Sequence, residues 1–175
     1  MSQRPVDEVE YANVFYASLN LDVSHFASMW HTFNVAHLLS TDVDRITRDH
    51  GISIADLHLL GALRIDRPRL LRATDLAMTL QVSNAVLSAR IARLGNRGFL
   101  VRQASAADRR AFELQLTAEG KTKVEEVLSS IERRSAYVRH FHSLPKEDRD
   151  ALARIMGNLH SKMDGEFMPV SRGKL

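Results

Sequence analysis

Cysteine is absent from this chain of 175 residues, and glycine (8), proline (4) and aromatic residues (6%) are sparse. Without a thiol the chain has no disulfide, no thiolate metal ligand and no cysteine nucleophile or redox sensor. The patterns Gly-x-Ser-x-Gly and His-Glu-x-x-His and a phosphate-binding glycine loop are also missing. Local motifs therefore indicate no enzyme and no cofactor, and catalysis would need residues assembled from distant parts of the chain.

A membrane span and a secretory leader are not apparent either. Residues 23–41 carry no Asp, Glu, Lys or Arg, but nine of these 19 residues are Ser, Thr, Asn or His. Such a segment is too polar for hydrocarbon and is better explained as a helix covered by protein on most sides. Asp7, Glu8 and Glu10 lie where the basic and apolar parts of a signal peptide would have to be. We therefore expect a cytoplasmic protein.

Positive charge is concentrated in the middle of the chain. Residues 64–110 hold ten arginines against three aspartates, a net charge of +7, which leaves −4 for the rest of a chain whose formal net charge is +3. A basic middle between mildly acidic ends is expected of a phosphate-binding face, although a solvated basic surface would show the same balance.

The basic middle begins with three predicted helices. Ser53 is a credible N-cap for the first helix, the second is expected over residues 72–80, and Ser83 caps the third after a tight turn at residues 81–82. A helix, a turn and a second, capped helix make up the helix-turn-helix unit, whose second helix reads DNA.

The third helix has a core face and an opposite face of small side chains. A helical wheel places Leu87, Ile91 and Leu94 together on the core face and Val86 and Arg90 near its edge. The remaining positions are expected to meet DNA: Asn84 at the N-terminus, Ala85, Ala89, Ala92 and Asn96 on the opposite side, and Ser88 and Arg93 on its flanks. Because alanines dominate this face, we expect few hydrogen bonds to bases, with Arg93 reaching guanine or phosphate.

A charged hairpin follows the third helix. Residues 99–102 and 111–116 are expected to form two strands, with Arg102 on the first and the tip Asp108, Arg109 and Arg110 between them. An arginine on such a tip suits a narrow minor groove, and Asp108 is placed to orient it. A plain charged turn is the alternative.

Both ends of the chain have helical periodicity. Residues 8–49 are expected to be helical with a break near residues 19–23, and Gly51 is a plausible stop. Thr117 is expected to cap a long helix that runs past Val138, and Pro145 begins the last one. The last helix carries an apolar stripe suited to packing on another helix, made of Leu152, Ile155, Met156, Leu159 and Met163.

Together these features predict a mainly α protein with a small β-wing. Residues 53–117 form a winged helix-turn-helix domain that binds DNA, and residues 1–52 and 118–175 form a helical dimerisation region. The residues expected to bind DNA are Ser83, Asn84, Ala85, Ser88, Ala89, Arg90, Arg93, Arg102, Asp108, Arg109 and Arg110.

The chain resembles the MarR family of winged-helix transcription regulators over residues 40–163. The resemblance is carried by Val82-Ser83, Leu94, residues 97–101, Asp108-Arg109-Arg110 and residues 116–120. It implies a homodimer with interlocked terminal helices that binds pseudo-palindromic operator DNA, usually as a repressor that a small ligand releases. A ligand-independent architectural DNA-binding protein is the alternative, since the alanine-rich face predicts weak direct readout.

The N-terminal segment is similar to the urate-responsive branch of that family. Tyr16 stands where the branch carries tryptophan, His58 where it carries aspartate and Gln103 where it carries a wing arginine, while Arg90 matches. The resemblance implies a pocket for a small aromatic or anionic ligand between the dimerisation region and the DNA-binding domain. Its expected residues are Tyr16, Trp30, His58 and Arg90.

These ligand assignments have structural alternatives. His58 also fits a hydrogen-bonded histidine in a domain seam, Trp30 fits core or dimer packing, and Arg90 fits a phosphate contact. If Arg90 served both ligand and DNA, the two would exclude one another. No metal site is expected within one chain, because histidines six residues apart, as at 25, 31 and 37, diverge on a helix.

Overall fold

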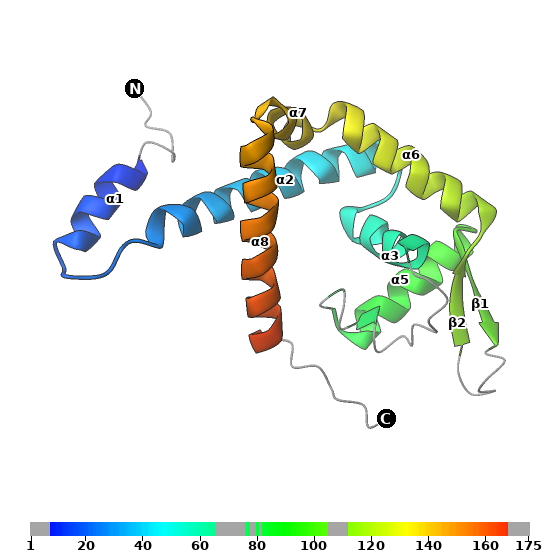
Figure 1. The fold of residues 1–175 in the computed structure, drawn as a ribbon. Helices are drawn as coiled ribbons and strands as arrows, with labels where there is room; N and C mark the ends of the chain where they lie inside the picture. Colours follow the sequence, from blue (N-terminus) through cyan, green and yellow to red (C-terminus); the bar gives the residue numbers. More distant parts are fainter. Residues whose placement is uncertain (1–7, 66–75, 78–79, 81, 105–111, 168–175) are drawn as a thin grey trace.

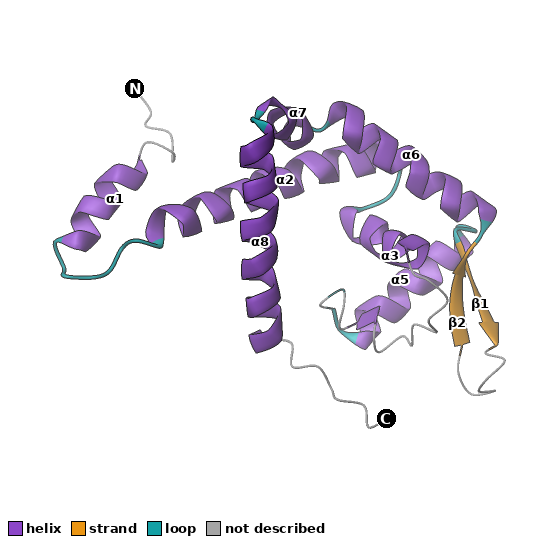
Figure 2. Ribbon diagram, viewed as in Figure 1, coloured by secondary structure: helices purple, strands orange, loops and turns teal. Residues whose placement is uncertain are grey.

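The computed structural model of the protein describes residues 8–65, 76–77, 80, 82–104 and 112–167. These residues form the mainly helical fold with a small β-wing that the sequence predicts (Figures 1 and 2). The elements are α1 (Glu8–Ala17), α2 (Phe26–Asp49), α3 (Ile54–Ile65), α5 (Asn84–Asn96), β1 (Leu100–Ala104), β2 (Phe112–Leu116), α6 (Ala118–Arg134), α7 (Ala136–Ser143) and α8 (Lys146–Phe167). None of these helices is long and apolar enough to cross a membrane.

The hydrophobic core lies where α3, α5, α6 and the start of β1 meet. Leu87, Ile91 and Leu94 of α5 are at most 4% exposed, so the core face predicted for this helix is confirmed. Leu76 and Ala77 reach the same core, although most of the helix expected over 72–80 lies outside the described residues. The core is completed by Ile52, Leu57, Leu59, Leu60, Phe99, Leu100, Val124 and Val127. It fixes one face of α5 and leaves the other open.

The wing packs against the start of α6. Strands β1 and β2 are antiparallel, in a register that runs from Leu100 opposite Leu116 to Ala104 opposite Phe112. Thr117 caps α6 as predicted, because its hydroxyl accepts from the amide of Gly120 at 2.9 Å. A Cβ on Gly120 would lie 1.9 Å from the carbonyl oxygen of Phe99, so only glycine permits this approach of α6 to β1.

The predicted break in the N-terminal helices is confirmed. Helix α1 ends at Ala17 and α2 begins at Phe26, and Asn20 between them has φ +57°. Gly51 follows α2 with φ +70°, a left-handed conformation that suits a helix stop. Figure 1 shows that the long helix α2 runs from α1 at one end of the molecule to α3 at the other.

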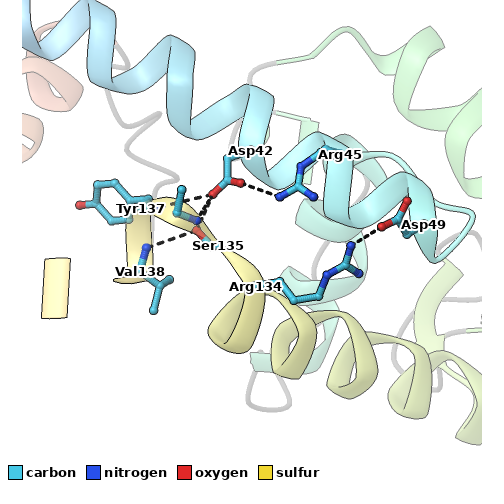
Figure 3. Close-up of polar contacts among 8 residues, drawn as sticks. Asp42, Arg45, Asp49, Arg134, Ser135, Tyr137 and Val138 are labelled. Carbon is cyan, nitrogen blue, oxygen red and sulfur yellow. Dashed lines mark hydrogen bonds and ion pairs between the residues drawn. The ribbon is translucent and has the colours of Figure 1, made fainter. Parts of the chain in front are cut away.

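The helix expected to run from Thr117 past Val138 is two helices, so that prediction is wrong. Ser135 has ψ 129°, which ends α6 and starts α7. The carboxylate of Asp42 in α2 accepts from the Ser135 hydroxyl and the Ala136 amide, both at 2.7 Å (Figure 3). This cap from a distant helix fixes the bend. Spacing alone could not reveal it, because Val138 keeps its helical register across the break.

Several helices keep apolar faces uncovered in a single chain. No residue of α8 is buried, and its predicted stripe is 38–53% exposed. Further apolar side chains of α1 and α2 are exposed by 43–72%, namely Tyr11, Val14, Phe15, Met29, Phe33, Val35 and Leu38. Helix α1 and the start of α2 lie at the opposite end of the molecule from α5 (Figure 1), so packing on their apolar faces leaves the core around α5 undisturbed.

Candidate nucleic-acid interface

The open side of α5 consists of small side chains. We call its exposed residues Asn84, Ala85, Ser88, Ala89, Ala92 and Asn96 the reading face. The Ser83 hydroxyl accepts from the Val86 amide at 3.3 Å, so the helix begins at the predicted cap. Val86 was expected near the core edge, but it is 48% exposed. Only Leu87 of this first turn reaches the core, so Val86 adds an apolar group beside the reading face.

Both cationic side chains of α5 meet one buried carboxylate. Arg93 donates a hydrogen bond to Oδ1 of Asp56 in α3, and Nε of Arg90 lies 3.9 Å from the same oxygen. Asp56 is 0% exposed, the Arg90 side chain 14% and the Arg93 side chain 51%. We call these three residues the Asp56 cluster. Arg93 is therefore both paired and accessible, whereas Arg90 is mostly covered.

The second oxygen of Asp56 closes a reciprocal cap at the start of α3. Oδ2 accepts from the Ser53 amide at 3.0 Å, while the Ser53 hydroxyl accepts from the Asp56 amide at 3.1 Å. Burial raises the pKa of Asp56, but the bonds from Ser53 and Arg93 outweigh burial and hold that pKa below its usual value. One carboxylate thus joins the start of α3 to the open side of α5.

Sequence reasoning identified Ser53 as a cap but missed Asp56. The available signal was the spacing Ser-x-x-Asp, in which an acidic residue three positions after the cap returns a bond to it. Nothing in that spacing connects Asp56 to Arg93, which lies 37 positions further along the chain.

The turn after α5 is also held by an arginine. The Arg97 guanidinium donates to the carbonyl oxygen of Gly51 at 2.7 Å and lies 4.8 Å from the centroid of the Phe99 ring. This contact ties the end of α5 to the turn between α2 and α3. It fixes the direction of the helix that carries the reading face.

The wing contributes one described arginine. Arg102 lies on β1 opposite Leu114 and is exposed, so it is accessible for a phosphate contact. The predicted tip residues Asp108, Arg109 and Arg110 lie outside the described residues. Their role in the minor groove stays a prediction.

The four residues expected to bind a ligand do not come together in one chain. Tyr16 contacts Phe26, with ring centroids 5.2 Å apart, and Phe26 stacks on Trp30 at 6.1 Å. This aromatic row joins α1 to the start of α2, whereas His58 on α3 and Arg90 on α5 lie at the other end of α2 (Figure 1). A site containing all four residues would need a second chain.

His58 lines a mostly apolar groove instead. The groove has a volume of about 560 Å³ and lies between α3 and α6, and its lining includes Leu57, His58, Gly61, Arg64, Leu80 and Leu128. Arg64 bonds Glu125 at 3.0 Å across the two helices. Neither Arg90 nor the aromatic row lines this groove, so His58 and Arg64 supply its polar groups.

The histidines of α2 do not form a metal centre with other described residues. Within the ranges that the structure describes, no three His, Asp or Glu side chains are grouped as metal ligands. His50 contacts the Ser130 hydroxyl at 2.8 Å and so links α2 to α6.

Comparison with known proteins agrees with this geometry. The model of the MarR family matches residues 50–111. The HTH-type transcriptional repressor YetL of Bacillus subtilis is 24% identical over 154 residues, which cover 87% of this chain and 86% of the relative. The HTH-type repressor MdtR of the same organism is 28% identical and covers 62% of this chain and 68% of the relative.

Solved structures show the same fold. The repressor CouR, bound to a 23-mer DNA duplex, superposes with a TM-score of 0.67 at 22% identity, covering 80% of this chain and 98% of that one. AbsC, a MarR family transcriptional regulator from Streptomyces coelicolor, gives a TM-score of 0.67 at 23% identity and covers 83% of this chain and 97% of its own.

The capped helix α5 with its open face and the adjoining two-stranded wing fit a winged-helix protein, and the repressor relatives place it in the class of DNA-binding transcription regulators. Within that class, the chain is similar to the MarR family, whose model matches residues 50–111, and to HTH-type transcriptional repressors. The similarity to the urate-responsive branch stays a prediction.

Proposed function

We propose that the chain acts as a homodimer that binds a pseudo-palindromic operator, represses transcription there and is released by a small ligand. The reading face of α5 carries the proposal. The buried face of this helix fixes it in the core, and its exposed alanines permit close approach to base edges and thymine methyl groups.

Two-fold symmetry gives the mechanism. Two α5 helices that enter successive major grooves must lie about 34 Å apart, one turn of DNA. Helix α6 connects the wing to α7, and α7 is fixed to α2 through Asp42 (Figure 3). A ligand that changes the angle between α3 and α6 would change the separation of the two reading faces and weaken binding.

The uncovered apolar faces support the homodimer. Helix α8 is amphipathic, because Ser161 lies opposite the centre of the apolar stripe on a helical wheel and the charged Arg154 lies off the stripe. We expect sedimentation to give a mass of two chains for the wild type and a monomer for Ile155→Glu. The matched control Ser161→Glu should stay dimeric. A dimer that survives Ile155→Glu would contradict the assignment of α8 to the interface.

The groove between α3 and α6 supports a small, partly apolar anion as the ligand. Its apolar lining suits a ring or short chain, and His58 and Arg64 are the groups for a carboxylate or phenolate. CouR from Rhodococcus jostii, a structural neighbour with a TM-score of 0.63, has been solved with p-coumaroyl-CoA bound. Such a ligand would compete with Glu125 for Arg64.

Calorimetry with a panel of aromatic acids and phenols tests the ligand, followed by titration of the hits into a complex with a DNA site selected from a random pool. We expect one class of compound to bind and release the DNA. Gly61→Phe, which fills the groove, should abolish ligand binding and leave DNA binding intact. No binding across the panel, or unchanged DNA affinity with ligand bound, would refute this part.

The alanines of the reading face also favour a second candidate, a ligand-independent architectural protein. Few long hydrogen-bonding side chains project from α5, so direct base readout is limited. Specific DNA-binding proteins prefer their site over random DNA by roughly a thousandfold or more. A preference well above that value would exclude the architectural candidate, whereas near-equal binding to all sequences would favour it.

A further inference from the structure

Both cationic side chains of α5 face one buried carboxylate, that of Asp56. Arg90 and Arg93 are the two cationic side chains of this helix, and both face Oδ1 of Asp56. The reading face beside them holds alanine, serine and asparagine. The side-chain charge that α5 can present to phosphates therefore comes from the Asp56 cluster.

We propose that Asp56 determines DNA specificity by holding Arg93 in one direction and by cancelling part of the charge on α5. This inference rests on the proposed DNA-reading function and adds a positioning residue that does not itself touch DNA. At the correct site, the oriented Arg93 meets its acceptor. At other sites, the reduced charge of the cluster weakens attraction to the backbone.

The geometry leaves Arg93 free to make a second contact. A guanidinium carries five N–H donors, and Asp56 accepts from one of its terminal nitrogens. The side chain is 51% exposed, so other donors of the same group are open to solvent. A head that is already oriented by Asp56 loses less conformational entropy when it meets a base or phosphate than a free side chain does.

Asp56 is itself held from two sides, which makes it a firm anchor. Its Oδ2 is fixed by the Ser53 amide at the start of α3, and its Oδ1 receives Arg93. The 0% exposure of Asp56 excludes water as a competing donor to the carboxylate. A shift of α3 would move this anchor and turn Arg93 with it, so the cluster also connects the α3 groove to the reading face.

Two roles for Asp56, stabilising the domain or positioning Arg93, predict different effects of its loss on DNA binding. If Asp56 only stabilises the domain, its loss lowers affinity for specific and random DNA together. If Asp56 restrains Arg93 and Arg90, its loss frees positive charge. Specific affinity then falls, affinity for random DNA rises, and the salt dependence on random DNA becomes steeper by about one unit per freed phosphate contact.

Asp56→Asn is the first test, read by fluorescence anisotropy on the selected site and on random duplex over a range of salt. Asparagine keeps the shape and an oxygen for Ser53, but its amide turns a donor toward Arg93. We expect the ratio of specific to random affinity to fall at least tenfold, with a steeper salt dependence on random DNA. An unchanged ratio, or equal loss on both duplexes, would overturn the proposal.

Ser53→Ala is the matched control, because it removes a cap bond and leaves the carboxylate facing Arg93. It should lower thermal stability while the affinity ratio and the salt dependence stay at wild-type values. A fall in the ratio for Ser53→Ala equal to that of Asp56→Asn would assign the effect to the cap and overturn the role of Arg93.

Arg93→Lys keeps the test decisive if Asp56→Asn fails to fold. Lysine retains the positive charge beside Asp56 but lacks the planar fork of donors. We expect affinity for random DNA to stay near wild type and specific affinity to fall, and a wild-type ratio would refute the inference. A wild-type protein without any preferred site would instead refute the proposed function.

Discussion

Asp42→Ala tests the account of the bend between α6 and α7. The carboxylate accepts from the Ser135 hydroxyl and the Ala136 amide at 2.7 Å, and Arg45 donates to its other oxygen at 3.1 Å (Figure 3). Alanine removes the acceptor that joins α2 to the first turn of α7. The Ser135 hydroxyl still accepts from the Val138 amide at 3.3 Å, so α7 keeps part of its N-terminal cap.

The expected loss follows from these contacts. A lost N-terminal cap costs about 1 kcal/mol, and hydrogen bonds to a charged group contribute about 1.5–3 kcal/mol. The Asp42 side chain is only 13% exposed, so water replaces little of what is lost. Because the Ser135 cap remains, we expect a decrease of about 2–3 kcal/mol in the free energy of unfolding, or roughly 4–12 °C in Tm.

Thermal unfolding followed by circular dichroism, at one protein concentration, measures this loss. The matched control is Asp150→Ala, which removes an exposed carboxylate paired with Lys146 on α8. That surface pair should contribute less than about 0.5 kcal/mol. If the Tm of Asp42→Ala equals that of Asp150→Ala, within a degree of the wild type, the Asp42 cap does not hold the bend between α6 and α7.

Three further results are expected. Burial raises the pKa of Asp42, but the hydrogen bonds from Ser135 and Arg45 outweigh burial and hold this pKa below the ordinary value of 3.8. The ionised carboxylate therefore stabilises the folded protein above pH 3.8. The gap in stability between wild type and Asp42→Ala should then narrow as the pH falls below 3.8 in chemical denaturation, and a constant gap would contradict it. Ala92→Glu should lower DNA affinity at least tenfold in anisotropy titrations without changing Tm, because the negative side chain repels phosphate. The control Thr122→Glu on α6 should change neither DNA affinity nor Tm. If Ala92→Glu binds DNA as tightly as the wild type, α5 does not contact DNA. Gly120→Ala should lower the free energy of unfolding by about 2 kcal/mol or more, measured by thermal melting, because the new Cβ would meet a backbone carbonyl. The control Gly61→Ala should be neutral or stabilising, because no atom lies within 4 Å of the new Cβ. Equal melting temperatures for the two variants would refute the close approach of α6 to β1.

Local signals predicted much of the fold. The caps Ser83 and Thr117 and the core positions Leu87, Ile91 and Leu94 follow from helix chemistry and periodicity, and the structure confirms them. Such features depend on neighbours three or four positions away, which the sequence displays directly.

Features that depend on distant contacts escaped prediction. The bend at Ser135 needs Asp42, which lies 93 positions earlier, and the Asp56 cluster joins residues 37 positions apart. Neither pairing leaves a periodic trace, because single polar side chains on separate helices meet only after the core has formed. The proposed ligand residues failed to gather in one chain for a related reason, since family resemblance carries no information on which chain supplies each group.

The most direct test of the central claim is selection of binding sites from a random DNA pool by the purified protein, read by sequencing. We expect enrichment of one palindrome whose two half-sites lie about ten base pairs apart, with loss of that enrichment in Ala92→Glu. A pool without any enriched sequence, or an unchanged palindrome selected by Ala92→Glu, would contradict the claim that α5 reads DNA.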